Sequence, residues 1–256
     1  MFGLGKVKKV SFEELPEEIQ EKLELVEIEF MEGNDPIDTF QYVADKYPGF
    51  LPARLNYASL LLDRGDTQSA KEVYTKVKKQ FPDEAGAIAG LATVFAEEGD
   101  FAKAAPLAKQ AIESGYDWPP CYEVIAKSLE HNGDSNEAAE SYLLGYRKSP
   151  HSWDFLQNYC RLKGLPFTPP TEDIEPCITM EQLDSLATYV DETANTPDSS
   201  GNPPGCDHTF RFAEKWSNQN NVDPIQLYQF LNAHGGFCDC EICFNVTQLL
   251  DEDFDN

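Results

Sequence analysis

Several side chains near the C-terminal end have the residue types that hold a metal ion. Three thiolates and one imidazole make a known tetrahedral zinc set, and the chain supplies it as Cys206, His208, Cys238 and Cys240. The C-x-C pair is tighter than the usual C-x2-C spacing, whereas Cys240 and Cys243 do have that spacing. The residue types therefore predict a candidate site for one zinc ion on Cys206, His208, Cys238 and Cys240.

Three interpretations of these side chains stay open from their spacing. A structural zinc site is closed by four protein ligands, whereas a catalytic one needs an open coordination position and a base such as Glu241. In the third interpretation the thiols pack as small hydrophobic groups, and His208 caps a helix or packs against one. The zinc-deaminase pattern, H-x-E with P-C-x-x-C, is absent from the sequence.

Short helices are expected to position these side chains. A capping box at 179–182 predicts a helix with Leu183, Leu186 and Val190 inward. Asp207 is expected to cap a second helix, and Asp223 followed by Pro224 to begin a third that ends at 235–236. The spacing of residues 237–247 decides neither strand nor helix.

Three sequence elements of this region resemble a bacterial family known only as a domain of unknown function, number 2695. These are C-D-H-T at 206–209, G-G-F-C-D-C-E at 235–241 and N-V at 245–246. Phe237 stands where the family has tyrosine, and Cys243 where it often has an aliphatic residue. The resemblance covers roughly residues 177–247 and implies no activity, because none is assigned to the family.

The N-terminal part of the chain is organised by a 34-residue period over residues 51–152. Equivalent positions hold Gly65, Gly99 and Gly133, then Asp66, Asp100 and Asp134, then Ala70, Ala104 and Ala138. This pattern resembles the tetratricopeptide repeat, in which each unit is a pair of antiparallel helices and stacking buries their apolar faces. The resemblance implies an all-α fold: a right-handed solenoid of helical hairpins, followed by a small, mainly α C-terminal domain.

The predicted domain organisation follows from this period. The solenoid occupies 1–165, with full repeats at 51–84, 85–118 and 119–152 and a capping helix at 153–164. Residues 17–50 are expected to form a degenerate repeat, with an unrelated helical hairpin as the alternative. Prolines at 166–176 predict an extended linker and the domain boundary. A Cys/His-containing domain at 177–250 and an acidic tail at 251–256 complete the chain.

The repeat resemblance also implies a concave face for binding. In each unit, specific positions of the first helix point to that face, which here gives Leu55, Ser59, Leu62, Ala89, Thr93, Glu97, Glu123, Lys127 and Glu130. The lysine and asparagine that clamp acidic chaperone tails are missing, because Leu55, Ser59, Ala89 and Thr93 occupy those positions. The face suits a protein or peptide with apolar and basic side chains. The alternatives are that the chain's own C-terminal domain or a neighbouring subunit uses it.

Composition narrows the classes of partner and compartment. The chain has 45 acidic against 20 basic residues and a formal net charge of −25, which disfavours nucleic acid and anionic membranes. There is no apolar run near the length of a membrane span and no secretory pattern at the start. Seven cysteines without an export signal favour reduced thiols or metal ligands in the cytoplasm.

These observations predict a non-enzymatic adaptor or scaffold that binds a peptide or helix in the repeat groove. The alternative is a zinc-dependent enzyme of unknown reaction with its site in the C-terminal Cys/His module. The sequence shows no phosphate-binding glycine loop, nucleotide fingerprint or serine-hydrolase elbow to favour that alternative.

Overall fold

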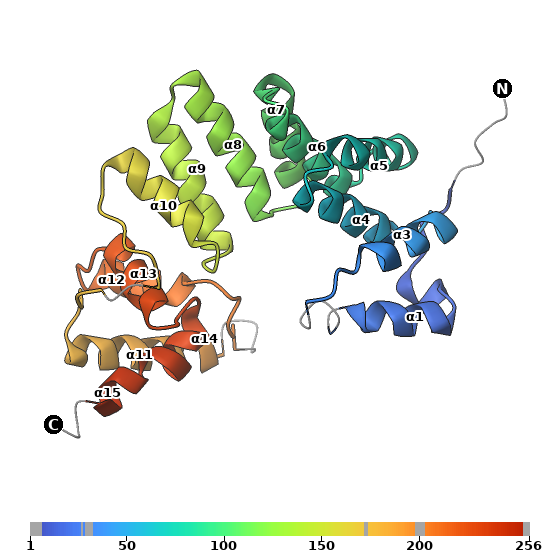
Figure 1. The fold of residues 1–256 in the computed structure, drawn as a ribbon. Coiled ribbons are helices and arrows are strands. Elements are labelled where there is room, and N and C mark those ends of the chain that lie inside the picture. The colour runs from blue at the N-terminus through green and yellow to red at the C-terminus, as the bar shows by residue number, and fades with distance from the viewer. Residues whose placement is uncertain (1–6, 27, 29–32, 172–173, 198–202, 253–256) are drawn as a thin grey trace, which may run out of the picture. The chain divides into compact units, whose positions relative to one another are not determined.

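The computed structural model describes residues 7–26, 28, 33–171, 174–197 and 203–252, and these residues form helices and no strands. Contacts divide the chain into two compact units, Met1–Asn132 and Gly133–Asn256. Figure 1 shows the order of the helices along the chain. The all-α prediction is confirmed.

The first unit is a series of helices that contact their neighbours in chain order. It contains η1 (Phe12–Glu14), α1 (Glu17–Glu24), α3 (Ile37–Lys46), α4 (Leu51–Asp63), α5 (Thr67–Gln80), α6 (Ala85–Glu97), α7 (Phe101–Glu113) and α8 (Pro119–Asn132). Beyond these sequential contacts, α4 contacts α6 and α6 contacts α8. The first helices of successive repeats therefore pack side by side, as a tetratricopeptide solenoid requires.

Glycine and aspartate set the corner of each repeat. Gly65 and Gly99 have φ angles of 78° and 75°, in the left-handed region that glycine adopts without steric cost. The next helix is then capped by aspartate, since Asp66 accepts the Ser69 amide at 3.1 Å and Asp100 the Lys103 amide at 3.3 Å. These two repeats fulfil the sequence prediction.

The third repeat keeps the glycine but not the side-chain cap. Gly133 has φ of 88°, whereas Asp134 makes no side-chain hydrogen bond to the helix that it precedes. Asp134 is nevertheless the N-cap residue of α9, so it begins that helix as Asp66 and Asp100 begin theirs. The backbone of Asp134 still accepts the first bond of α9 from Ala138 at 3.0 Å.

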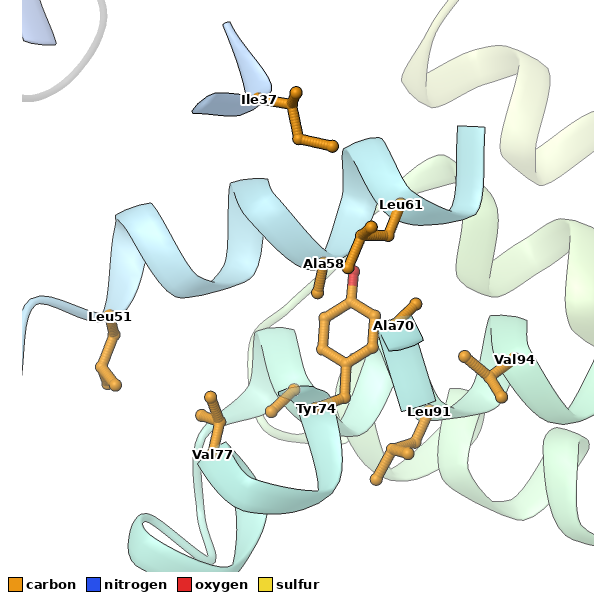
Figure 2. Close-up of a cluster of buried hydrophobic side chains, with 10 residues drawn as sticks. Ile37, Leu51, Ala58, Leu61, Ala70, Tyr74, Val77, Leu91 and Val94 are labelled. Atoms are coloured by element: carbon orange, nitrogen blue, oxygen red, sulfur yellow. The ribbon is translucent and has the colours of Figure 1, made fainter. Parts of the chain in front are cut away.

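The core of the first unit forms where α4, α5 and α6 meet. Tyr74 of α5 is 5% exposed, and Figure 2 shows its ring lying close to Ala58 and Leu61 of α4. On the α6 side the ring lies over Gly90, so close that a Cβ there would be 2.2 Å from the Tyr74 Cζ. The bare backbone of Gly90 thus allows α5 and α6 to approach closely.

Residues 17–50, which are expected to form a degenerate repeat, begin with the short helix α1. This helix ends at Glu24 with Leu25 as its C-cap. Ile19 and Val43, which are 3% and 0% exposed, pack in one apolar cluster with Phe50. This cluster covers the start of α4.

The second unit joins a helical hairpin to the C-terminal module, defined here as residues 177–250. The unit contains α9 (Ser135–Lys148), α10 (Trp153–Lys163), α11 (Met180–Asn195), α12 (Arg211–Gln219), α13 (Pro224–Ala233), α14 (Asp239–Glu241), the π-helical η2 (Ile242–Val246) and α15 (Gln248–Glu252). Gly164 ends α10 in the left-handed conformation, with φ of 67°. Within the undecided segment 237–247, residues 239–246 are helical, in α14 and η2.

The C-terminal module packs onto α9. The buried Tyr146 hydroxyl accepts a hydrogen bond from Asn232 Nδ2 at 2.8 Å, and its ring lies 5.2 Å from that of Tyr228. Arg147 Nε donates to Glu214 at 3.1 Å. Because of this packing, the division between compact units falls before the predicted linker at 166–176, which is itself non-helical where described.

Two of the three capping signals predicted for the module are present. At the start of α11, the Thr179 amide donates to the Gln182 side-chain oxygen at 2.9 Å, and the Gln182 amide donates to the Thr179 hydroxyl at 3.2 Å. Asp223 accepts the Ile225 amide at 2.8 Å at the start of α13. None of the described helices is both long and apolar enough to cross a membrane.

Candidate metal centre and binding face

Two segments of the C-terminal module bring the predicted metal ligands together. The ligand atoms of Cys206, His208 and Cys238 all lie within 4.8 Å of one another. Cys240 lies outside that group of three, but its Sγ is 3.2 Å from the Sγ of Cys238. Cys206 and His208 come from the loop before α12, and Cys238 and Cys240 from the start of α14.

The four side chains form a site that is buried on one side. Cys238 is 2% exposed, Cys206 and Cys240 are half-buried, and His208 is exposed. Burial raises the pKa values of the Cys238 and Cys240 thiols above the ordinary value. Cys238 is therefore shielded from solvent, whereas His208 lies on the solvent side, from which an ion can enter.

Asp239 connects the two ligand-bearing segments. Its carboxylate is fully buried and accepts the amides of Phe212 and Ala213 at 2.8 and 2.9 Å, so it caps α12 from a distant part of the chain. Its own amide donates to the Thr209 carbonyl at 2.9 Å. Burial raises the pKa of Asp239 to about 6, while the two amide hydrogen bonds act to lower it. Sequence reasoning missed this residue.

Asp207, the predicted cap of α12, instead forms hydrogen bonds within the loop before that helix. Its carboxylate accepts hydrogen bonds from the Thr209 amide at 3.2 Å and the Thr209 hydroxyl at 2.6 Å. It also forms an ion pair with Arg211 at 3.3 Å. Asp207 thus stabilises the ligand-bearing loop, and the prediction that it caps α12 is wrong because Asp239 occupies that position.

The glycines and the asparagine of the motif hold the second segment in place. Asn245 Nδ2 donates to the Gly235 carbonyl at 2.7 Å. A Cβ on Gly236 would lie 2.6 Å from Cγ2 of Val246, so no larger residue fits there without movement. The Phe237 amide donates to the Glu241 carboxylate at 2.8 Å, which gives Glu241 a structural partner.

The backbone of His208 is unusual. Its φ of 61° lies in the left-handed region, which non-glycine residues adopt at a cost of about 1 kcal/mol or more. Its amide donates to the Cys206 sulfur at 3.3 Å. The loop is thus folded tightly around the first cysteine, and this fold places the imidazole beside the thiols.

Cys243 does not join the cluster of donors. Its Sγ lies 3.8 Å from the Ala187 carbonyl oxygen and 3.9 Å from the Asp239 carbonyl oxygen, so either carbonyl can accept its single S–H. Burial raises its pKa. The C-x2-C spacing of Cys240 and Cys243 therefore does not place both thiols in the group that the structure brings together.

A second candidate site is the face predicted on α4, α6 and α8, called here the candidate binding face. Ala89 is 4% exposed, Glu97 is exposed, and the other residues of the face are half-buried. Because α6 contacts both α4 and α8, these residues lie on adjacent helices of one unit. Most of the predicted face therefore retains surface that a partner can reach.

The polar groups of this face are largely satisfied within the protein. Thr93 Oγ1 donates to the Ala89 carbonyl at 3.3 Å, and Glu123 forms an ion pair with Lys127 at 2.7 Å. Leu55 lies over Gly86, since a Cβ there would be 2.9 Å from Leu55 Cδ1. The middle of the face is therefore small and apolar, and carboxylates lie toward α8 and the end of α6.

Sequence reasoning also missed two pockets. One, of about 460 Å³, is lined by residues of α7 and α8, including Phe101 and His131, whose rings lie 5.0 Å apart. The other, of about 370 Å³, lies in the second unit and includes Arg147 and Arg211. Each arginine there is paired, with Glu214 and Asp207 respectively, and Lys148 also lines this pocket.

Comparison with known proteins finds a family match in each part of the chain. Residues 61–128 match the family described as Tetratricopeptide repeat, and residues 186–245 match the one described as Protein of unknown function (DUF2695). Uncharacterized proteins of Mycobacterium tuberculosis and Mycobacterium bovis are each 41% identical over 69 residues, or 27% of this chain. The chain spans 63% of the length of these curated relatives.

The similar solved structures are repeat proteins. A thermophilic tetratricopeptide-repeat protein of Thermus thermophilus has 19% identity and a TM-score of 0.47, over 60% of this chain and 86% of that chain. A tetratricopeptide-repeat protein of Parabacteroides merdae has 11% identity and a TM-score of 0.45, over 90% and 84%. Residues 61–128 are therefore similar to tetratricopeptide repeats, and residues 186–245 to the family of unknown function (DUF2695).

Proposed function

We propose that this protein is a non-enzymatic adaptor, and that its candidate binding face holds a polypeptide segment with apolar and basic side chains. Tetratricopeptide-repeat proteins generally bind proteins or peptides, so the repeat family supports an interaction role. Beyond this general role, we propose which face of the protein the partner contacts and which side chains the partner carries.

The observation that carries the proposal is the chemistry of the candidate binding face. Thr93 and Leu55, which are both half-buried, give its middle a mainly apolar surface, with the Thr93 hydroxyl already bonded to its own helix. A partner can cover this surface without leaving a buried hydroxyl unsatisfied, which would cost about 1–3 kcal/mol.

Charge defines the other end of the face. Among the named residues of the candidate binding face, three are carboxylates and one, Lys127, carries an ammonium group. The carboxylates are Glu97, Glu123 and Glu130. Because opposite charges guide and orient association, this end favours a partner with lysine or arginine there. The overall charge of −25 strengthens the same preference at long range.

The test uses a fluorescent amphipathic peptide that carries leucine on one side and lysine at one end, with an otherwise identical peptide in which glutamate replaces lysine. Binding to the full chain is measured by anisotropy at moderate and high salt. We expect the lysine peptide to bind more tightly, with an affinity that falls as salt increases.

Two double variants separate a specific face from general attraction to an acidic protein. Glu97→Lys with Glu130→Lys reverses charge on the face, whereas Glu72→Lys with Glu113→Lys reverses exposed charges on α5 and α7. Both pairs change the net charge equally. The proposal predicts a marked loss of affinity for the first pair and little for the second; equal effects of the two pairs would count against it.

A further inference from the structure

We propose that Cys206, His208, Cys238 and Cys240 bind one zinc ion in a closed, tetrahedral, structural site that joins the loop before α12 to the start of α14. The proposal does not depend on the candidate binding face, since it concerns the other compact unit. Nothing in the family description assigns a metal to this region.

Distances favour a metal over a set of independent thiols. Zinc–sulfur bonds of about 2.3 Å at tetrahedral angles place two ligand sulfurs about 3.8 Å apart. The three mutually grouped ligand atoms lie within 4.8 Å, and the Cys238 and Cys240 sulfurs are 3.2 Å apart. Small changes in side-chain torsion angles bring these separations to the ideal value from either side.

Hydrogen bonds fix the two backbone segments that carry the ligands. Asp239 holds α12 and, through its amide, the Thr209 carbonyl, so the two ligand segments are fixed to each other. Asp207 fixes Thr209, and Glu241 fixes Phe237. These hydrogen bonds fix the backbone that carries the ligands, and so they limit the positions that the ligand side chains can take.

His208 supplies an independent observation. Its backbone adopts a left-handed conformation that disfavours residues with a Cβ, and the folded loop must compensate for that cost. An exposed histidine gives no packing energy in return. Zinc coordination would explain the strained backbone, because this conformation places the His208 imidazole where it can bind the same ion as the thiols.

The donor set selects the class of ion. Three thiolates and one imidazole suit zinc and other thiophilic divalent ions, and they disfavour magnesium and calcium, which prefer oxygen. With four protein ligands, no coordination position remains for water. The site therefore stabilises the module, and Glu241, which bonds the Phe237 amide, has no metal-bound water to activate.

The experiment loads the metal-free full chain with cobalt(II), whose absorption reports both sulfur ligation and geometry. We expect one equivalent to bind, with sulfur-to-cobalt charge-transfer bands and ligand-field bands of tetrahedral intensity. Zinc should displace it. Addition of azide should leave the spectrum unchanged; a shift with azide would reveal an open position and overturn the structural assignment.

Single variants test the ligand set, with circular dichroism recorded for each to detect unfolding. Cys206→Ser, Cys238→Ser and Cys240→Ser should each weaken binding at least about tenfold, the lower end of what loss of an outer-shell partner costs. Cys243→Ser is the matched control, because Cys243 is half-buried and near the cluster. Unchanged cobalt spectra in Cys240→Ser, or loss of binding in Cys243→Ser, would overturn this ligand set.

Two changes at His208 separate ligation from backbone strain. His208→Asn retains a residue that tolerates the left-handed conformation but removes the imidazole, so it should weaken binding. His208→Cys restores a ligand and should bind cobalt with a four-sulfur spectrum. Full binding in His208→Asn would exclude the histidine, and a wild-type chain that takes up neither zinc nor cobalt would overturn the proposal as a whole.

Discussion

Substituting Gly90 by alanine is a sharp test of how the repeats stack. Gly90 lies in α6, and a Cβ built on it would be 2.2 Å from Cζ and 2.3 Å from Cε1 of Tyr74. The Tyr74 ring is 5% exposed and lies in the cluster with Ala58 and Leu61 shown in Figure 2. Because the Tyr74 ring packs against α4, it cannot move away from Gly90 without displacing α4 from α5.

The expected cost combines two opposing effects. Ordinary contact begins at 3.4 Å, so the ring or helix must move by more than 1 Å from its 2.2 Å separation. Overpacking of this kind costs about 1–3 kcal/mol, while replacing glycine by alanine inside a helix returns about 1 kcal/mol. We expect Gly90→Ala to lower the free energy of unfolding by up to about 2 kcal/mol, or the melting temperature by up to several degrees.

Gly86 is the matched control in the same helix. There, the contact for a Cβ is Leu55 Cδ1 at 2.9 Å, the far end of a flexible side chain. Gly86→Ala should therefore be nearly neutral or stabilise by up to about 1 kcal/mol. Because the two substitutions are chemically identical, their difference isolates the contact with Tyr74.

The assay is urea and thermal unfolding of the full chain followed by circular dichroism. A double-mutant cycle adds Tyr74→Leu, in whose background Gly90→Ala should cost less. If Gly90→Ala is as stable as Gly86→Ala, the described packing of α5 on α6 is wrong.

Two further substitutions test the caps. Asp66→Ala should cost about 1 kcal/mol because it removes the cap of the Ser69 amide, whereas Asp134→Ala should cost clearly less, as compared by urea unfolding; similar losses would refute the distinction. Asp239→Ala leaves two buried amides of α12 unpaired and should cost about 2 kcal/mol or more, with increased proteolysis of the second unit; wild-type protease resistance would contradict this role.

The repeat architecture could be predicted because its signals are local. A glycine that ends a helix and an aspartate that begins the next act within a few residues, as Gly65 and Asp66 do. The same holds for Thr179 with Gln182 and for Asp223. Each of these patterns depends only on residues that are close together in the sequence.

The candidate metal centre was predictable in residue types but not in detail. Asp239 caps α12 across 27 residues of chain, so a nearer aspartate, Asp207, was the natural but wrong choice. The π-helical turn at Ile242–Val246 turns Cys243 toward the Ala187 carbonyl rather than to the other thiols. Both features depend on tertiary packing that spacing alone does not encode.

The central claim is that a partner binds on the candidate binding face, and a photo-crosslinking measurement tests it most directly. The leucine–lysine peptide carries a photoreactive group, is irradiated with the full chain, and the crosslinked residues are identified by mass spectrometry. The account predicts crosslinks on α4, α6 and α8, at residues such as Ser59, Thr93 and Glu97. Crosslinks confined to other helices, with these three unlabelled, would contradict it.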